Sequence, residues 1–148
     1  MFDIESRSQD EIIIITKKTT IKFNIANSTI DANLTVGKIE GPGEFEIGDA
    51  TIRGIATESG KTIYDAEIGG VHVGILGGIE ENLDDIVADV LCTSSIRAVR
   101  EIEPKLVVSM GNVDAMVSEL KLSARTEKKL KIKSLDSLPV TKEVVVLN

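Results

Sequence analysis

Short apolar runs separated by polar turns fill the first half of the chain. Residues 12–15 are four consecutive isoleucines, a β-branched run typical of a strand that is buried on both faces. Residues 20–25 alternate polar with apolar side chains, and this period of two indicates a half-buried strand. The polar segment 16–19 joins the two strands as a hairpin, whereas the polar residues 1–10 are predicted to be frayed.

A glycine pair marks the clearest hairpin of the sequence. The apolar runs 63–68 and 71–76 are separated by two glycines alone, a spacing that favours a tight turn with positive φ. Pairing the residues on either side of these glycines places Glu67 directly opposite His72, on the polar face of the hairpin. A cross-strand pair of this kind is ordinary sheet stabilisation, so we interpret it as structural.

The pattern changes after Gly77 and Gly78, where strands begin to alternate with helices. Helix 114–124 is predicted from Met116, Val117 and Leu120, which share one helical face. The predicted elements are strands at 87–92, 106–110, 130–132 and 144–147 and helices at 96–102 and 114–124. Hairpins followed by alternating strands and helices predict an α/β (α+β) fold, and the absence of a long linker predicts a single domain over 1–148.

Charge is unevenly distributed along the chain. Residues 1–120 carry 10 basic and 21 acidic side chains, whereas residues 121–148 carry 7 basic and 3 acidic ones. The overall net charge of −7 argues against general affinity for nucleic acid. In the basic segment, lysines alternate with apolar residues from Lys129 to Lys133, a pattern that protects an edge strand from unwanted pairing.

The chain contains one cysteine, Cys92, which favours a reducing compartment because it has no internal partner. Its place at the end of an apolar run predicts a buried, inert thiol. The first residues lack the pattern of a secretory signal, and no apolar run approaches the ~18 residues of a membrane helix. We therefore expect a cytoplasmic protein that does not engage a membrane.

Several short motifs occur in an order that resembles small metallo-β-lactamase-superfamily proteins, specifically the zinc-dependent-hydrolase branch similar to ascorbate-phosphate lactonases. The first is GPGEFEI at residues 41–47, which resembles the GPGEYEI element of that branch. The others are IRGI at 52–55, TIY at 62–64, GVHVGILG at 70–77, ADVL at 88–91 and IEPKLVVSM at 102–110. The resemblance implies an αββα four-layer sandwich, here abbreviated.

The metal ligands that this resemblance implies are missing from the sequence. The family holds two metal ions mainly with histidines from a His-x-His-x-Asp-His loop, and the corresponding interval, 25–40, contains no histidine. A metal-bridging Asp usually follows Leu-Gly, but Gly78 stands there, and Gly111 stands where a histidine usually follows Pro-Met. With one histidine in the whole chain, the resemblance predicts a degenerate member that needs no metal or other cofactor.

Other features are open to a functional or a structural reading. Gly78, Gly111 and Asn112 follow strands where the family builds its pocket; strand-end glycines can bind an anion or let two backbones approach closely, and we favour packing. The acid pairs at 80–81 and 84–85 lack calcium-loop spacing and fit a solvated helix start.

These observations predict a non-catalytic structural or interaction subunit of metallo-β-lactamase fold, with no catalytic residue and no metal site. Loss of a metal cluster also removes a structural tie, so compensating burial in a symmetric homodimer is expected. Two alternatives remain from the sequence. The protein could be a hydrolase completed by ligands from a partner chain, or a module that binds a small ligand in the vacated pocket.

Overall fold

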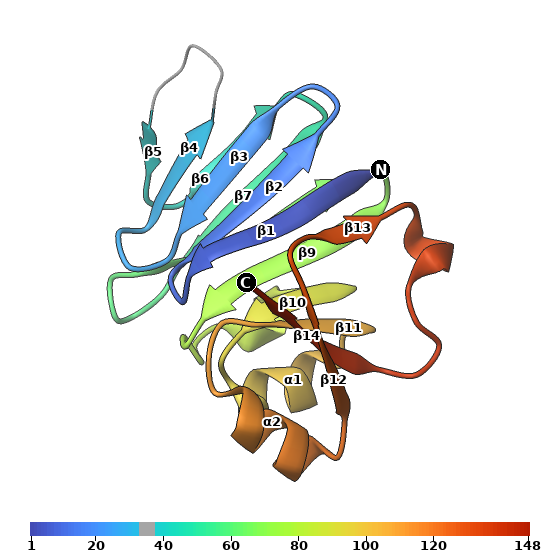
Figure 1. Ribbon diagram of the computed structural model, residues 1–148. Coiled ribbons are helices and arrows are strands. Elements are labelled where there is room, and N and C mark those ends of the chain that lie inside the picture. The colour runs from blue at the N-terminus through green and yellow to red at the C-terminus, as the bar shows by residue number, and fades with distance from the viewer. Residues whose placement is uncertain (33–37) are drawn as a thin grey trace.

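The computed structural model describes residues 1–32 and 38–148, and these residues form two packed β-sheets with helices on one outer face (Figure 1). The smaller sheet is antiparallel, with the strand order β13-β1-β2-β3-β4-β5. Its strands are β1 (Phe2–Ser8), β2 (Glu11–Thr16), β3 (Thr20–Asn24), β4 (Thr29–Ala32), β5 (Lys38–Glu40) and β13 (Leu130–Ile132).

The larger sheet has the order β12-β14-β11-β10-β9-β8-β7-β6. Its strands are β6 (Gly43–Ile47), β7 (Ala50–Ala56), β8 (Thr62–Ile68), β9 (Val71–Gly77), β10 (Val90–Thr93), β11 (Leu106–Ser109), β12 (Ser123–Glu127) and β14 (Glu143–Leu147). Strands β6 to β9 are antiparallel hairpins, whereas β9, β10, β11, β14 and β12 run parallel. The sequence pattern predicts this arrangement, with hairpins in the first half of the chain and crossover connections in the second half.

The β8–β9 hairpin forms around Gly69 and Gly70, as the spacing predicts. Both glycines have positive φ, at 57° and 82°, which is the backbone of the tight turns that suit the twist of paired strands. The resulting register sets Ile68 against Val71 and Glu67 against His72.

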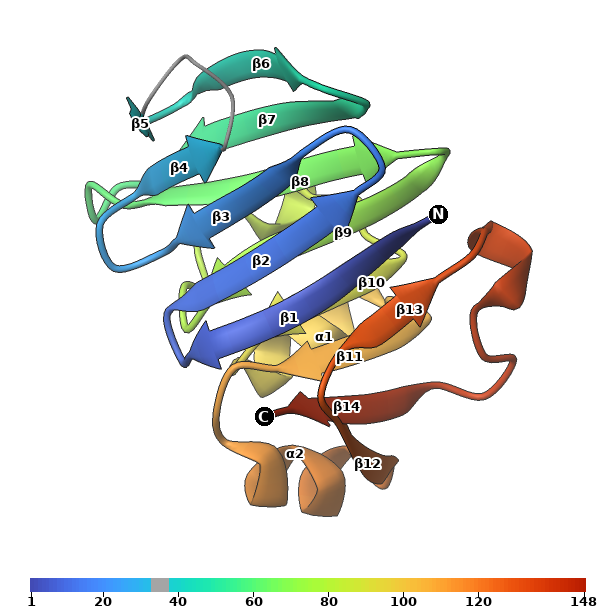
Figure 2. The same ribbon diagram turned by 45° about the horizontal axis from the view of Figure 1, so that its top comes forward.

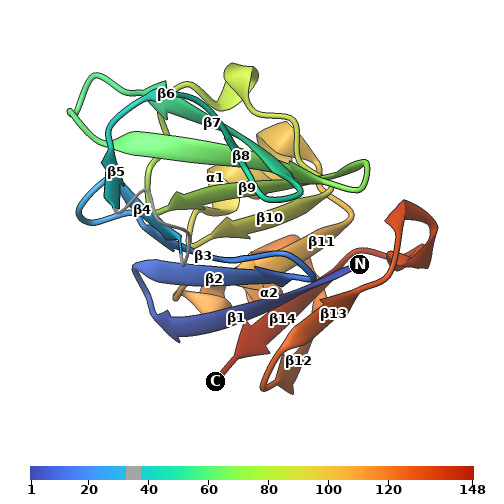
Figure 3. The ribbon, with the colours of Figure 1, turned by 90° about the horizontal axis from the view of Figure 1, so that it is seen from above.

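The main core lies between the two sheets and is almost entirely aliphatic. Alternate residues of each strand point inward, so that Ile12 and Ile14 of β2 meet the larger sheet while Ile13 points outward. Two aromatic side chains, Phe23 and Tyr64, contact each other across the sandwich with ring centroids 5.5 Å apart. Figure 3 shows the two sheets as separate layers.

A second core lies on the other face of the larger sheet, under the helices α1 (Ile96–Ile102) and α2 (Val113–Leu120). In Figure 2 the smaller sheet is in front, the larger sheet follows and α1 is behind. Two 3₁₀ turns, η1 (Leu83–Asp85) and η2 (Leu135–Ser137), complete the elements. Within the described residues no helix covers the outer face of the smaller sheet, where Ile13 sits between Glu5 and Lys22 on neighbouring strands.

The structure corrects the sequence predictions for residues 1–10 and for the helix at 114–124. Residues 1–10 are not frayed, because β1 pairs with both β2 and β13 and buries Phe2 and Ile4. The helix predicted at 114–124 ends at Leu120, since Lys121 adopts a left-handed φ of 55°, and the chain then enters β12. Strands β4 and β5 were also not predicted.

Cys92 lies in β10 with its side chain in the main core, as predicted for an inert thiol. Burial in apolar surroundings raises the pKa of the Cys92 thiol far above its ordinary value, which disfavours the reactive thiolate. We expect no reaction of the native protein with a thiol reagent at neutral pH, and one equivalent of reaction after unfolding in denaturant. Rapid labelling of the native protein, measured by mass spectrometry, would contradict this burial.

Candidate functional site

Parallel strands of the larger sheet bring their carboxyl ends to one edge of the sandwich. Thr93 at the end of β10 is in register with Ser109 of β11 and with Gly77 of β9. In open α/β sheets ligands bind outside this edge of the strands, which makes it the first place to look for a site. Gly78 directly follows β9, and Gly111 and Asn112 come two and three residues after the end of β11.

Two side chains from the turns of the smaller sheet lie against this edge. A Cβ atom placed on Gly77, whose φ is +57°, would lie 3.0 Å from Cγ2 of Ile25. A Cβ atom on Gly111, whose φ is +114°, would meet the Gln9 side chain at 3.4 Å. Gly77 therefore allows a close approach of the two layers at this edge, whereas a Cβ atom on Gly111 would make only an ordinary van der Waals contact with the exposed Gln9 side chain.

The polar groups at the same edge bind one another. The Thr93 hydroxyl donates to the carbonyl of Gly77 at 2.7 Å and accepts from the backbone N–H of Ser95 at 2.9 Å. The Ser95 hydroxyl donates to the Glu80 carboxylate and accepts from the N–H of Ala98, which caps α1. These groups have their hydrogen-bonding capacity met inside the protein, as buried polar groups usually do.

Asn112 and Gly78 also lie beside Ser94, in the loop after β10. The Asn112 side-chain N–H donates to the Ser94 carbonyl at 3.3 Å, and a Cβ atom on Gly78 would lie 3.3 Å from the Ser94 hydroxyl. Gly78, Gly111 and Asn112 are thus brought to one edge, where their neighbours are local loop and hairpin residues.

A hollow of about 350 Å³ opens beside Gly111, between the β1–β2 turn and the ends of β11 and β14. Its lining residues are Ser6, Arg7, Ser8, Gln9, Ser109, Met110, Gly111, Val113, Val146, Leu147 and Asn148. None of these is an acid, a histidine or a cysteine, so the hollow provides none of the usual side-chain ligands of zinc. Over all the residues that the structure describes, no three His, Cys, Asp or Glu side chains are placed to hold a metal ion.

His72 belongs to a second cluster, on the outer face of the larger sheet. Its Nε2 atom lies 3.3 Å from a Glu67 carboxylate oxygen, and its Nδ1 atom lies 3.3 Å from a carboxylate oxygen of the buried Asp65. Asp65 in turn lies 3.4 Å from the Arg53 guanidinium, which also donates to the carbonyl of Asp85. Each ring nitrogen of His72 therefore lies beside a carboxylate oxygen of the same cluster.

The sequence interpretation identified Glu67 and His72 but missed Asp65 and Arg53. The signal was available, because Asp65 is two residues from Glu67 and therefore shares its face of β8. Arg53 stands directly opposite Asp65 in the β7–β8 register. The cluster is an ionic network that links β7, β8, β9 and η1.

The acid pair at 80–81 links loops and is not the solvated helix start that we predicted. Glu80 accepts from Ser95, as described, and Glu81 accepts from the backbone N–H of Ser59 at 3.1 Å. That hydrogen bond lowers the pKa of the Glu81 carboxyl, since it stabilises the charged form. Asp84 and Asp85 do lie at the start of a helical turn, in η1.

Comparison with known proteins identifies the fold. No family model matches the sequence, and no curated protein matches it. Among solved structures, the chain is similar to a Thermotoga maritima protein described as a "putative zn-dependent hydrolase of the metallo-beta-lactamase superfamily". The two share 18% sequence identity with a TM-score of 0.71, over 99% of this chain and 98% of that chain. The protein therefore has the metallo-β-lactamase-type α/β sandwich that the resemblance implied, but in the described residues helices cover only the larger sheet, so the expected fourth layer is missing. In addition, no helix of the described residues is long and apolar enough to span a membrane.

Proposed function

We propose that this protein is a non-catalytic metallo-β-lactamase-fold protein that works in the cytoplasm as a structural or interaction subunit, with the whole chain acting as one domain. The proposal rests on the residues found at the carboxyl edge of the parallel strands. Glycines occupy positions 78 and 111, where the resemblance expects metal ligands, and glycine has no side chain to offer a metal ion. Neither the adjoining hollow nor the His72 cluster offers convergent ligand atoms.

The second part of the proposal is that the subunit is a symmetric homodimer. A sandwich without a metal cluster lacks one structural tie, and association restores stability through burial of surface. Light scattering at micromolar protein concentration is expected to give twice the 15.9 kDa mass of the chain. A monomer mass at micromolar concentration would contradict the homodimer. It would not affect the proposal that the protein is non-catalytic.

Metal analysis tests the central claim. After incubation with zinc and dialysis, the purified protein is expected to retain far less than one equivalent, because the described residues provide no set of ligands. The His72→Ala variant is the matched control, since it removes the one imidazole of the chain and any weak surface binding that depends on it. Stoichiometric zinc that persists in both proteins would overturn the proposal.

A further inference from the structure

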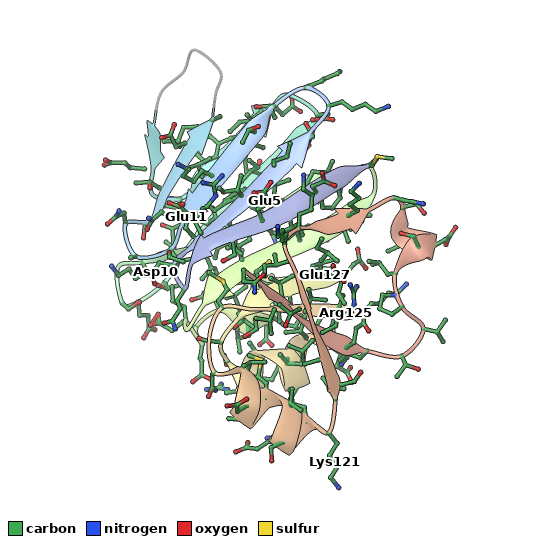
Figure 4. The ribbon with its side chains drawn as sticks, in the orientation of Figure 1. Glu5, Asp10, Glu11, Lys121, Arg125 and Glu127 are labelled. Carbon is green, nitrogen blue, oxygen red and sulfur yellow. The ribbon has the colours of Figure 1, made fainter. Side chains whose placement is uncertain are left out.

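Strand β12 is an unpaired edge of the larger sheet. It pairs with β14 on one side, and within the described residues no strand pairs with its other side. None of its five side chains is buried: four are exposed and Glu127 is half-buried. Figure 4 labels Arg125 and Glu127 along this strand.

The register with β14 determines which backbone groups of β12 remain free. The Asn148 N–H donates to the Glu127 carbonyl at 3.1 Å, and Glu127 is paired with Leu147 in a parallel register. In a parallel ladder alternate residues direct both backbone groups to the same neighbour, so Ser123, Arg125 and Glu127 face β14. The N–H and C=O groups of Ala124 and Thr126 therefore point to the open edge.

These free groups restrict how two β12 strands could pair. In an antiparallel pair, hydrogen-bonded residues stand opposite each other and exchange both bonds, so Ala124 and Thr126 must meet outward-facing residues of the other strand. Placing Ala124 opposite Thr126 sets Arg125 against a second Arg125, which is unfavourable. Placing Thr126 opposite a second Thr126 sets Arg125 against Glu127 on both sides of the twofold axis, which is favourable.

The surroundings of Arg125 reinforce this choice. A hollow of about 520 Å³ beside β12 is lined by Arg125, Glu127, Lys128, Lys129, Leu130 and Lys131. Four of these six side chains are cationic, and Arg125 contacts Glu127 and Glu143 within its own chain at 2.8 Å. An additional carboxylate opposite Arg125 would enter a basic environment, whereas an additional cation there would be repelled.

We propose that a second copy of this chain pairs with β12 in antiparallel orientation, with Thr126 opposite the partner subunit's Thr126 and Arg125 opposite the partner's Glu127. The pairing joins two eight-stranded sheets into one continuous sheet, by strand addition at an open edge. This inference rests on the proposed homodimer and gives its interface.

Proline at position 126 tests the use of this edge. The Thr126 N–H makes no bond to β14, so the Thr126→Pro variant is expected to fold, while its missing donor and bulky ring block the partner strand. The matched control Thr126→Val keeps the N–H and is expected to remain a dimer. Light scattering should give a monomer mass for the proline variant, with an unchanged circular dichroism spectrum. A proline variant that folds and stays dimeric would overturn the β12 interface while the homodimer stands.

Cysteine cross-linking tests the register and does not depend on the proline variant. Thr126→Cys is expected to form an intersubunit disulfide under mild oxidation, because directly opposed residues of a hydrogen-bonded pair have Cα atoms about 5.5 Å apart. Ala124→Cys is the control, since the register sets it opposite Lys128 of the partner subunit. The buried Cys92 does not compete. Efficient cross-linking at 124 but not at 126 would overturn the register, and failure at both positions in a dimeric protein would overturn the interface. A wild-type monomer would refute the homodimer itself.

Discussion

Replacing Gly77 by alanine is expected to lower the free energy of unfolding by about 1–3 kcal/mol. The backbone of Gly77 has a φ of +57°, where an L-residue is strained, and the new Cβ atom would lie 3.0 Å from Cγ2 of Ile25. The Gly77 carbonyl also accepts hydrogen bonds from the Thr93 hydroxyl and the Ser94 N–H, so a backbone shift that relieved the contact would weaken both. Denaturant unfolding with circular dichroism measures the change.

Gly78→Ala is the matched control for this experiment. Gly78 has no positive φ, and its nearest contact would be the Ser94 hydroxyl at 3.3 Å, on a small side chain. Its effect is expected to be well below that of Gly77→Ala. Equal stability of the two variants would contradict the close approach of Ile25 to Gly77 and the packing role of this glycine.

Some glycines have a role that the sequence predicts, whereas the role of others depends on residues far away in the chain. The two glycines at 69–70 separate two apolar runs, and this spacing predicts a hairpin because the geometry of a tight turn depends on local φ angles. The structure has that hairpin. The neighbours of Gly77 and Gly111, in contrast, come from residues 25 and 9, which are distant in sequence. Only the tertiary structure shows that Gly77 lies against Ile25 and that Gly111 lies beside Gln9.

Two strands show different reasons for the errors in secondary structure. In β1, Phe2 and Ile4 alternate with Asp3 and Glu5, so a period of two was present but was outweighed by the polar residues that follow. In β12 no side chain is buried, so hydrophobic periodicity carries no signal at all. The strand is defined by backbone pairing with β14, which depends on an element about twenty residues later.

Among the candidate site residues, some could also be placed from the sequence and others only from the structure. Glu67 and His72 could be paired from the sequence because they flank one short turn. Arg53 lies on a third strand, β7, and its place in the cluster depends on the register between β7 and β8. The absence of metal-ligand residues at positions 78 and 111 could be read from the sequence directly.

Replacing Tyr64 by phenylalanine is expected to stabilise the protein, by about 1–3 kcal/mol at neutral pH. Tyr64 is fully buried between the sheets, and its hydroxyl has no hydrogen-bond partner among the residues that the structure describes. A buried hydroxyl without a partner carries a desolvation cost, and phenylalanine removes the hydroxyl while it keeps the ring that contacts Phe23. Phe23→Leu is the control, since it disturbs the same contact without removing a polar group and is expected to destabilise.

The pH dependence of stability gives an independent test of the same hydroxyl. Burial raises the pKa of Tyr64 from 10.0 to about 12, because the charged phenolate is disfavoured inside the sandwich. Below pH 10 the folded and unfolded states both carry the neutral phenol. Between pH 10 and pH 12 the unfolded state loses this proton first, so wild-type stability falls as pH rises through that window, and the Tyr64→Phe variant lacks this contribution. The chain has one tyrosine and no tryptophan, so tyrosinate absorbance reports Tyr64 alone. Ionisation of the native protein near pH 10, or a variant less stable than wild type at neutral pH, would show that the hydroxyl has a partner or access to water.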